Sequence, residues 1–207
     1  MFDMLTLNPN NPHPHDVAEI VSVLKSGGVV CYPTDTIYGL GCDIFNKKAI
    51  EKLYRIKKRE KKKQFSFICS DFTQIGEFAV LSNEVFRLMR RVLPGAYTFI
   101  LPASTHAPRT VVEKKRRTVG IRMPNSRLCM DIVSLLGNTL VTTSVNYSGQ
   151  DSLNDPVEIE REFGSRLDLV VDGGILQTEP STILDATTDT ITVIRQGKGP
   201  LEPLNIW

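Results

Sequence analysis

Short apolar runs that alternate with amphipathic segments constrain the fold of this chain more than any other sequence feature. Residues 29–32, 65–69 and 140–144 are apolar enough to form buried strands. Helical and extended segments alternate in the first half of the chain, and extended segments cluster toward its C-terminal end. This order predicts an α/β fold in which helices pack on a twisted mixed sheet.

The remaining boundaries follow from capping and turn residues. We expect a helix that Asp16 caps and Gly27-Gly28 ends, and another that Ser126 caps and Gly137 ends. A third helix carries the apolar stripe Ile50, Leu53 and Tyr54. Further helices are expected at residues 83–92 and 156–163, and further strands at 5–7, 97–101, 118–123, 169–172, 182–185 and 191–195.

Composition places the chain among ordinary globular proteins. It has 207 residues, 41% of them apolar, and no linker-like segment divides it, so we expect a single domain over residues 1–207 without a second C-terminal domain. No apolar run approaches the roughly 20 residues of a membrane span, and no secretory signal is visible. We therefore expect a cytoplasmic protein with buried, reduced cysteines and no membrane partner. No cysteine or histidine spacing predicts a tightly bound, protein-ligated metal.

Positive charge is concentrated in two short segments. Residues 55–63 (RIKKREKKK) carry a net charge of +6 and residues 113–117 (EKKRR) one of +3, although the net charge of the whole chain is only +2. Two interpretations are open: a polyanion site for a nucleoside triphosphate or RNA, or solvated helix ends, where basic side chains are favoured.

Five segments carry unusual polar or basic side chains and are candidates for a ligand site, because such sites lie where polar loops leave strand ends. They are residues 33–41 (PTDTIYGLG), 57–63, 118–124 (TVGIRMP), 142–149 (TTSVNYSG) and 172–197. Arg59 matches phosphate bidentately, whereas Lys57 and Lys63 act as point charges. Arg122 is either a structural ion pair or a carboxylate clamp, and the hydroxyl-rich segments are either ligand loops or well-bonded turns.

Taken in order, these segments resemble the YrdC/Sua5/YciO family from about residue 27 to residue 197, and most closely its single-domain YciO-type branch. The shared motifs are PT-[DE]-T-x-YGLG, KxR, PG-x-x-T, T-x-x-x-R-x-P, SxN followed by SG, STI-x-D and RxG. In this chain they are residues 33–41, Lys57 with Arg59, Pro94-Gly95 with Thr98, Thr118 with Arg122 and Pro124, Ser144 with Asn146 and Ser148-Gly149, residues 181–185, and Arg195 with Gly197.

The resemblance implies an α/β fold with a large, positively charged cavity and a nucleotidyltransferase activity. The reaction would convert L-threonine, bicarbonate and ATP into threonylcarbamoyl-AMP and pyrophosphate. Mg²⁺ would be bound to the triphosphate of ATP. Downstream transfer proteins would then carry the threonylcarbamoyl group to a tRNA adenosine. The resemblance implies these residue roles: threonine binding by Thr36, Arg122, Thr142 and Ser181; ATP binding by Arg59, Lys63, Thr118, Ser144, Ser152 and Arg195; and catalysis by Lys57, Arg59, Ser144 and Asn146.

The sequence departs from the family pattern at four positions. Glu60 and Gln64 stand where many relatives have proline, Ile68 where they often have histidine, and Thr143 where a proline is common. These departures raise two alternatives to threonine chemistry. One is an adenylate-forming enzyme that acts on another carbamoylated substrate, and the other is a double-stranded RNA or tRNA-binding module that uses the basic segments.

Overall fold

One mixed sheet runs through the whole computed structural model, which describes residues 4–60, 63–177, 179–188 and 190–204. The strand order across the sheet is β1 (Met4–Thr6), β8 (Leu169–Asp172), β2 (Val30–Tyr32), β3 (Gly39–Asp43), β7 (Leu140–Ser144), β4 (Ser66–Ile68), β6 (Thr118–Arg122), β5 (Tyr97–Pro102), β9 (Thr182–Asp185) and β10 (Thr192–Arg195). The pairs β1–β8, β8–β2, β4–β6 and β5–β9 are parallel, and the other neighbours are antiparallel.

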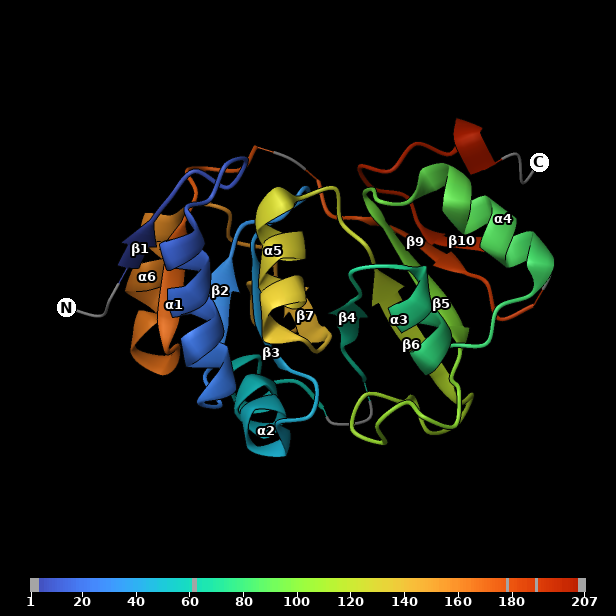
Figure 1. Cartoon of the computed structure of the whole chain (residues 1–207), viewed down its shortest axis with the longest axis horizontal. Coiled ribbons are helices and arrows are strands. Elements are labelled where there is room, and N and C mark those ends of the chain that lie inside the picture. Colours follow the sequence, from blue (N-terminus) through green and yellow to red (C-terminus); the bar gives the residue numbers. More distant parts are fainter. Residues whose placement is uncertain (1–3, 61–62, 178, 189, 205–207) are drawn as a thin grey trace.

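The helices lie on both faces of this sheet, and Figure 1 shows α1 and α5 side by side. The α-helices are α1 (Pro14–Lys25), α2 (Lys47–Ile56), α3 (Phe72–Phe78), α4 (Asn83–Val92), α5 (Arg127–Leu136) and α6 (Pro156–Phe163), and the 3₁₀ turns are Gly164–Arg166 and Glu202–Leu204. The predicted α/β class with a mixed sheet is confirmed.

Alternation along the strands divides the core into two layers. Val30 and Tyr32 pack with α1 and α5, whereas Val29 and Cys31 face the layer that contains α2 and α6. This is the expected result for extended chain, because successive side chains point to opposite faces of a sheet. The sheet is therefore buried on both faces around β2.

The same alternation leaves part of one face without an apolar cover. Val141 and Phe99 belong to the α2 layer, whereas their neighbours Thr142 and Thr98 point to the opposite face. The residues that follow this second phase and line a cavity are Gly39, Ser66, Thr98, Arg122, Thr142 and Ser144. On the side of β7, β4, β6, β5 and β9, the face that carries α1 and α5 elsewhere is polar and hollow.

Two helix ends test the sequence-based boundaries. Helix α5 begins after the Ser126 cap and ends at Gly137, whose φ of 76° is the left-handed conformation that glycine adopts readily. The predicted Asp16 cap is wrong, because α1 starts at Pro14 and the His13 side chain accepts from the His15 N–H at 3.2 Å. Pro14 suits this first position, where its missing N–H has no intrahelical partner.

Two elements were not predicted from the sequence, α3 and the strand β3 inside the glycine-rich segment 33–41. The four cysteines are free and buried, as expected. Within the described residues, no helix is both long enough and apolar enough to cross a bilayer.

Candidate functional site

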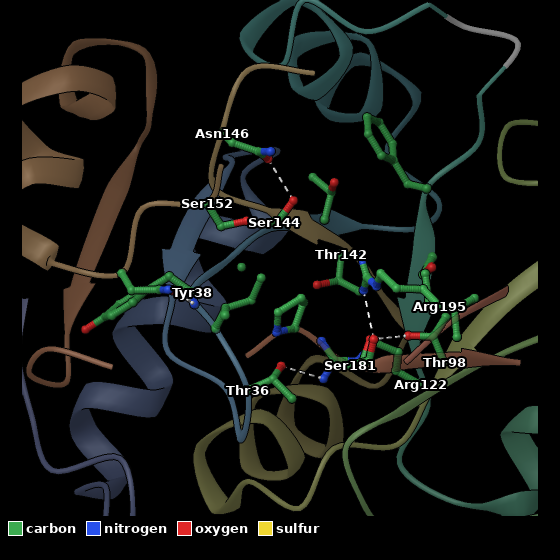
Figure 2. Close-up of a pocket in the computed structure, with 18 of the residues that line it drawn as sticks. Thr36, Tyr38, Thr98, Arg122, Thr142, Ser144, Asn146, Ser152, Ser181 and Arg195 are labelled. Carbon is green, nitrogen blue, oxygen red and sulfur yellow. Dashed lines mark hydrogen bonds between the residues drawn. The ribbon is translucent and has the colours of Figure 1, made fainter. Parts of the chain in front are cut away.

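A cavity of about 460 Å³ occupies the hollow part of the sheet face. Its floor is formed by strands β3, β7, β4, β6, β5 and β9, and its rim by the segments after β2, after β7 and before β9. Figure 2 shows Ser144, Asn146 and Ser152 on one side of this space and Thr36, Arg122 and Ser181 on the opposite side. A volume of this size accommodates a small-molecule ligand.

Most of the predicted site residues meet in this cavity, although five separate parts of the chain supply them. Those that line it are Thr36, Arg59, Arg122, Thr142, Ser144, Asn146, Ser152, Ser181 and Arg195. Lys57, Lys63 and Thr118 do not line it. The cavity therefore contains three guanidinium groups and a set of hydroxyls.

Arg122 is held at the end of β6 by two neighbours. Its Nη2 donates to Asp35 Oδ1 at 3.1 Å and to Thr36 Oγ1 at 3.0 Å. The second Asp35 oxygen accepts from the Asn125 N–H at 2.9 Å, so the carboxylate is itself fixed. The buried Arg122 Nε has no hydrogen-bond partner among the described residues. Arg122 is thus both an ion pair and a cavity-lining cation with unused hydrogen-bonding capacity.

Arg195 brings a second positive charge to the same side of the cavity. Its Nη2 donates to the Ser181 carbonyl at 2.8 Å, and the Ser181 hydroxyl lies 2.8 Å from Thr98 Oγ1. Burial lowers the pKa of Arg195, and the positive charge of nearby Arg122 lowers it further. Two guanidiniums that repel each other across one cavity favour an anion between them.

Arg59 is the third guanidinium in the cavity lining. Its Nε donates to the Lys63 carbonyl at 2.8 Å and its Nη2 to the Gln64 carbonyl at 3.0 Å, while its plane lies over the Phe65 ring at 5.3 Å. Burial lowers its pKa. These contacts fix the direction in which the guanidinium faces the cavity.

Lys57 lies beneath the cavity and is 1% exposed. Its Nζ donates to the Ser144 carbonyl at 2.6 Å and to Asn146 Oδ1, which also accepts from Ser144 Oγ at 2.7 Å. Its carbonyl accepts from the Ser148 N–H at 3.0 Å. Lys57 therefore joins the end of α2 to the segment after β7 and orients two residues that do line the cavity.

Burial, followed by the positive charge of Arg59, lowers the Lys57 pKa to about 7. Desolvation acts in this direction because it disfavours the charged form of an amine. The Lys57 amine therefore changes between its charged and neutral forms near neutral pH.

The other two predicted residues lie elsewhere. Lys63 meets the site through its backbone, because its carbonyl holds Arg59. Thr118 is buried at the start of β6, where it pairs with Pro102 of β5. The neighbouring Lys61 and Lys62 of the predicted basic segment lie outside the described residues.

Two glycines of β3 leave room for a buried tyrosine beside the cavity floor. A Cβ on Gly41 would lie 2.7 Å from the Val141 carbonyl oxygen and 2.8 Å from the Tyr32 ring. The Tyr32 hydroxyl uses the space that Gly39 and Gly41 leave, and it donates to Thr142 Oγ1 at 2.8 Å. The glycine-rich sequence is thus explained by close packing of a buried tyrosine against a strand.

Several residues that line the cavity or hold its lining in place were not among the predicted site residues. Asp35 orients Arg122, and Thr98 orients Ser181. Asn154 accepts from the Tyr38 N–H at 3.2 Å, which ties the segment after β7 to the segment after β2. A signal for Thr98 exists in the sequence, because it is a polar residue within the apolar strand Tyr97–Pro102.

The site is suited to a magnesium ion that is bound mainly by the phosphates of a nucleotide and not by protein side chains. No group of three or more histidine, cysteine or acidic side chains that could hold a metal is found within the described residues. Asp151 brings a carboxylate to the cavity lining. A Mg²⁺ ion that keeps most of its water and binds phosphate oxygens needs few protein ligands, so the residues present are compatible with one.

Comparison with protein families decides the relationship. The family model Sua5_yciO_yrdC, whose description is "Telomere recombination", matches residues 22–197. The chain belongs to the Sua5/YciO/YrdC family. The predicted family membership is therefore confirmed over most of the chain.

Two relatives represent different branches of the family. The uncharacterized protein YciO of Escherichia coli K12 is 34% identical over 204 residues, which are 98% of this chain and 99% of YciO. A threonylcarbamoyl-AMP synthase of Vibrio vulnificus is 36% identical over 186 residues, which are 88% of this chain and 98% of the synthase.

Solved structures agree with this relationship. The crystal structure of E. coli YciO matches with a TM-score of 0.92 and covers 99% of this chain and 100% of that chain, at 34% identity. The crystal structure of P. abyssi Sua5 complexed with L-threonine matches with a TM-score of 0.89 over 97% of this chain and 59% of that chain, at 25% identity.

The four departures from the family pattern do not all reach the cavity. Gln64 and Thr143 line it. Ile68 is buried with α1 and α5, and Glu60 is exposed. The ligand-facing differences from the pattern are thus Gln64 and Thr143.

Proposed function

We propose that this protein forms threonylcarbamoyl-AMP from L-threonine, bicarbonate and ATP and releases pyrophosphate. The observation that carries the proposal is the convergence of Arg59, Arg122 and Arg195 on one hydroxyl-lined cavity. Such a site is suited to two anions that must meet, because cations between them offset their repulsion. A related synthase from V. vulnificus and the threonine complex of P. abyssi Sua5 support the choice of substrates.

The chemistry requires positioning rather than a side-chain nucleophile. Bicarbonate takes up a proton and loses water to give carbon dioxide; the threonine amine adds to it and loses a proton, which gives a carbamate. A carbamate oxygen then attacks the α-phosphorus of ATP, and the bond from that phosphorus to the bridging oxygen of the β-phosphate breaks. Pyrophosphate leaves with the bond electrons, so in-line placement and charge neutralisation supply the catalysis.

The residues are suited to divide this work between the two sides of the cavity. Arg122, with Thr36 and Ser181, would bind the threonine carboxylate and hydroxyl, as its fixed guanidinium and free Nε favour. Arg59, Arg195 and Ser144 would bind the triphosphate, while bound Mg²⁺ would supply charge neutralisation of its phosphates. The product would then be passed to proteins that modify a tRNA adenosine.

Pyrophosphate release tests this proposal. Incubation with ATP and bicarbonate should release pyrophosphate when L-threonine is present and not when it is omitted. At subsaturating L-threonine, Arg122→Gln should lose most of the threonine-dependent release, whereas Arg161→Gln, on the exposed side of α6, should retain it. The proposal is contradicted if pyrophosphate is released equally with and without L-threonine, or if the folded protein releases none.

A second candidate follows from Gln64 and Thr143, which line the cavity and depart from the family pattern. In this alternative the carbamoylated substrate is another small amino acid or amine. A thermal-shift screen of amines with ATP and bicarbonate separates the two candidates. Stabilisation that is selective for L-threonine eliminates the alternative, and selective stabilisation by another amine favours it.

A further inference from the structure

A second cavity, of about 570 Å³, lies between α2 and the segment that precedes β6. Lys47 and Arg109 line it together with Lys114 and Arg117 of the basic segment 113–117. The candidate active site uses none of these four residues. The second cavity therefore gives this basic segment a location that the proposed function does not explain.

The 113–117 segment is folded so that two of its cations reach this cavity. The Glu113 carboxylate accepts from the Lys115 and Arg116 N–H groups at 3.0 and 2.6 Å, so the one acid of the segment is used within its own turn. The Arg116 guanidinium pairs with Asp185 at 2.7 Å on β9. Lys114 and Arg117 remain on the cavity.

Arg117 adds an independent observation. Its φ of 52° is in the left-handed region, which L-residues other than glycine rarely adopt. Glycine would relieve this strain, yet the position carries a long cationic side chain that lines the cavity. Strained backbone conformations cluster at functional sites, and here the strained residue carries a guanidinium that lines the cavity.

The charges of the cavity are unbalanced. Within the described part of the chain, no ion pair involves Lys47, Arg109, Lys114 or Arg117. Glu51 also lines the cavity, so the lining carries four cations and one acid. Cations gathered in a concave space produce a positive potential that attracts anions.

The size and walls of the cavity favour a small ligand. Pockets of roughly 300–1,000 Å³ are typical of small-molecule sites. Ile50, Tyr54 and Val112 provide apolar wall beside the cations. A polynucleotide needs a groove that tracks several phosphates, whereas four cations around one cavity of this volume suit one or two phosphate groups.

We propose that this second cavity binds the phosphate groups of a small phosphorylated molecule. Gln64 lines both cavities, and its carbonyl accepts from Arg59 Nη2 at 3.0 Å. The second site therefore adjoins the candidate active site without sharing its cations.

Calorimetric titration with inorganic pyrophosphate at low ionic strength tests the proposal on the full chain. The wild type should show two binding events. Lys114→Glu should weaken one of them by about tenfold or more, because it reverses a charge that faces the ligand. Lys115→Glu is the matched control, since it makes the same charge change on the next residue, outside the cavity lining. Arg195→Ala should weaken the other event.

Each other outcome overturns the proposal. A single event that Arg195→Ala removes assigns all pyrophosphate binding to the first cavity. Equal losses in Lys114→Glu and Lys115→Glu indicate a diffuse positive surface. Binding of a short RNA duplex, with no second pyrophosphate event, indicates a polynucleotide surface instead. Both variants replace exposed side chains, so thermal unfolding should verify that they remain folded.

Discussion

Replacement of Lys57 by methionine should change how the stability of the protein depends on pH. Lys57 is 1% exposed, and burial, with the nearby charge of Arg59, lowers its pKa from 10.5 to about 7. In the unfolded chain the amine regains its ordinary pKa. Between these two pKa values the unfolded state binds more protons than the folded state, so the wild-type stability rises with pH.

The magnitude follows from the size of the shift. One pKa unit corresponds to about 1.36 kcal/mol, and below about pH 7 both states are protonated, so the gain begins only there. From about pH 7 to about pH 8.5 the wild type should gain roughly 1.5 kcal/mol of unfolding free energy relative to Lys57→Met. Above that pH the slopes of the individual proteins change, because burial raises the pKa values of the four cysteines, which give the wild type and the variant the same opposite dependence in more alkaline solution.

Urea unfolding of both proteins across this pH range measures the difference. Lys48→Met, an exposed position on the same helix, is the control and should keep the wild-type slope. Parallel pH profiles for the wild type and Lys57→Met would refute the reasoning, because they would mean that the buried amine keeps its proton throughout.

Three further substitutions test other parts of the site. Arg122→Gln should raise the KM for threonine by about a hundredfold, with a smaller change in the KM for ATP, because a charged hydrogen bond to a carboxylate contributes about 1.5–3 kcal/mol. Steady-state pyrophosphate release measures both KM values. Equal changes in the two would argue against a role of Arg122 in binding the threonine carboxylate. Gly41→Ala should destabilise the fold by about 1–3 kcal/mol in urea unfolding, since its Cβ would meet the Tyr32 ring at 2.8 Å. Gly76→Ala in α3 is the control: its Cβ would have nothing within 4 Å, so this variant should be neutral or stabilising in the same assay. Thr98→Val should cost about 0.5–1.5 kcal/mol by removing a buried hydrogen bond, and calorimetric unfolding at an unchanged melting temperature would contradict this.

The parts of the fold that local chemistry specifies could be predicted from the sequence. Helix α5 has a side-chain cap at Ser126 and a left-handed glycine at Gly137, and both boundaries were predicted. Helix α3 is seven residues long and contains Gly76, so its helical signal is weak. Strand β3 was interpreted as a turn because its glycines are explained by contacts with Tyr32 of β2 and with residues of β7, which lie far away in the sequence.

The candidate site shows the same division. Motif order brought Thr36, Arg122 and Arg195 together in the prediction, and all three line the cavity. The depth of Lys57 and the orientation of Arg122 by Asp35 depend on contacts between residues far apart in the chain. The spacing of residues along the sequence does not reveal such contacts. A motif therefore identifies which residues belong to a site, but not how they are arranged.

The placement of the cavity on the strands themselves has a consequence for its motions. Its floor is built from residues of β3, β7, β4, β6, β5 and β9, whose amides are secured by ladder hydrogen bonds in the middle of the sheet. Those amides can exchange with deuterium only when the sheet separates, whereas amides on the rim exchange through local opening. We therefore expect the segments after β2 and β7 to open when a ligand enters or leaves, while the floor keeps its shape for as long as the protein stays folded.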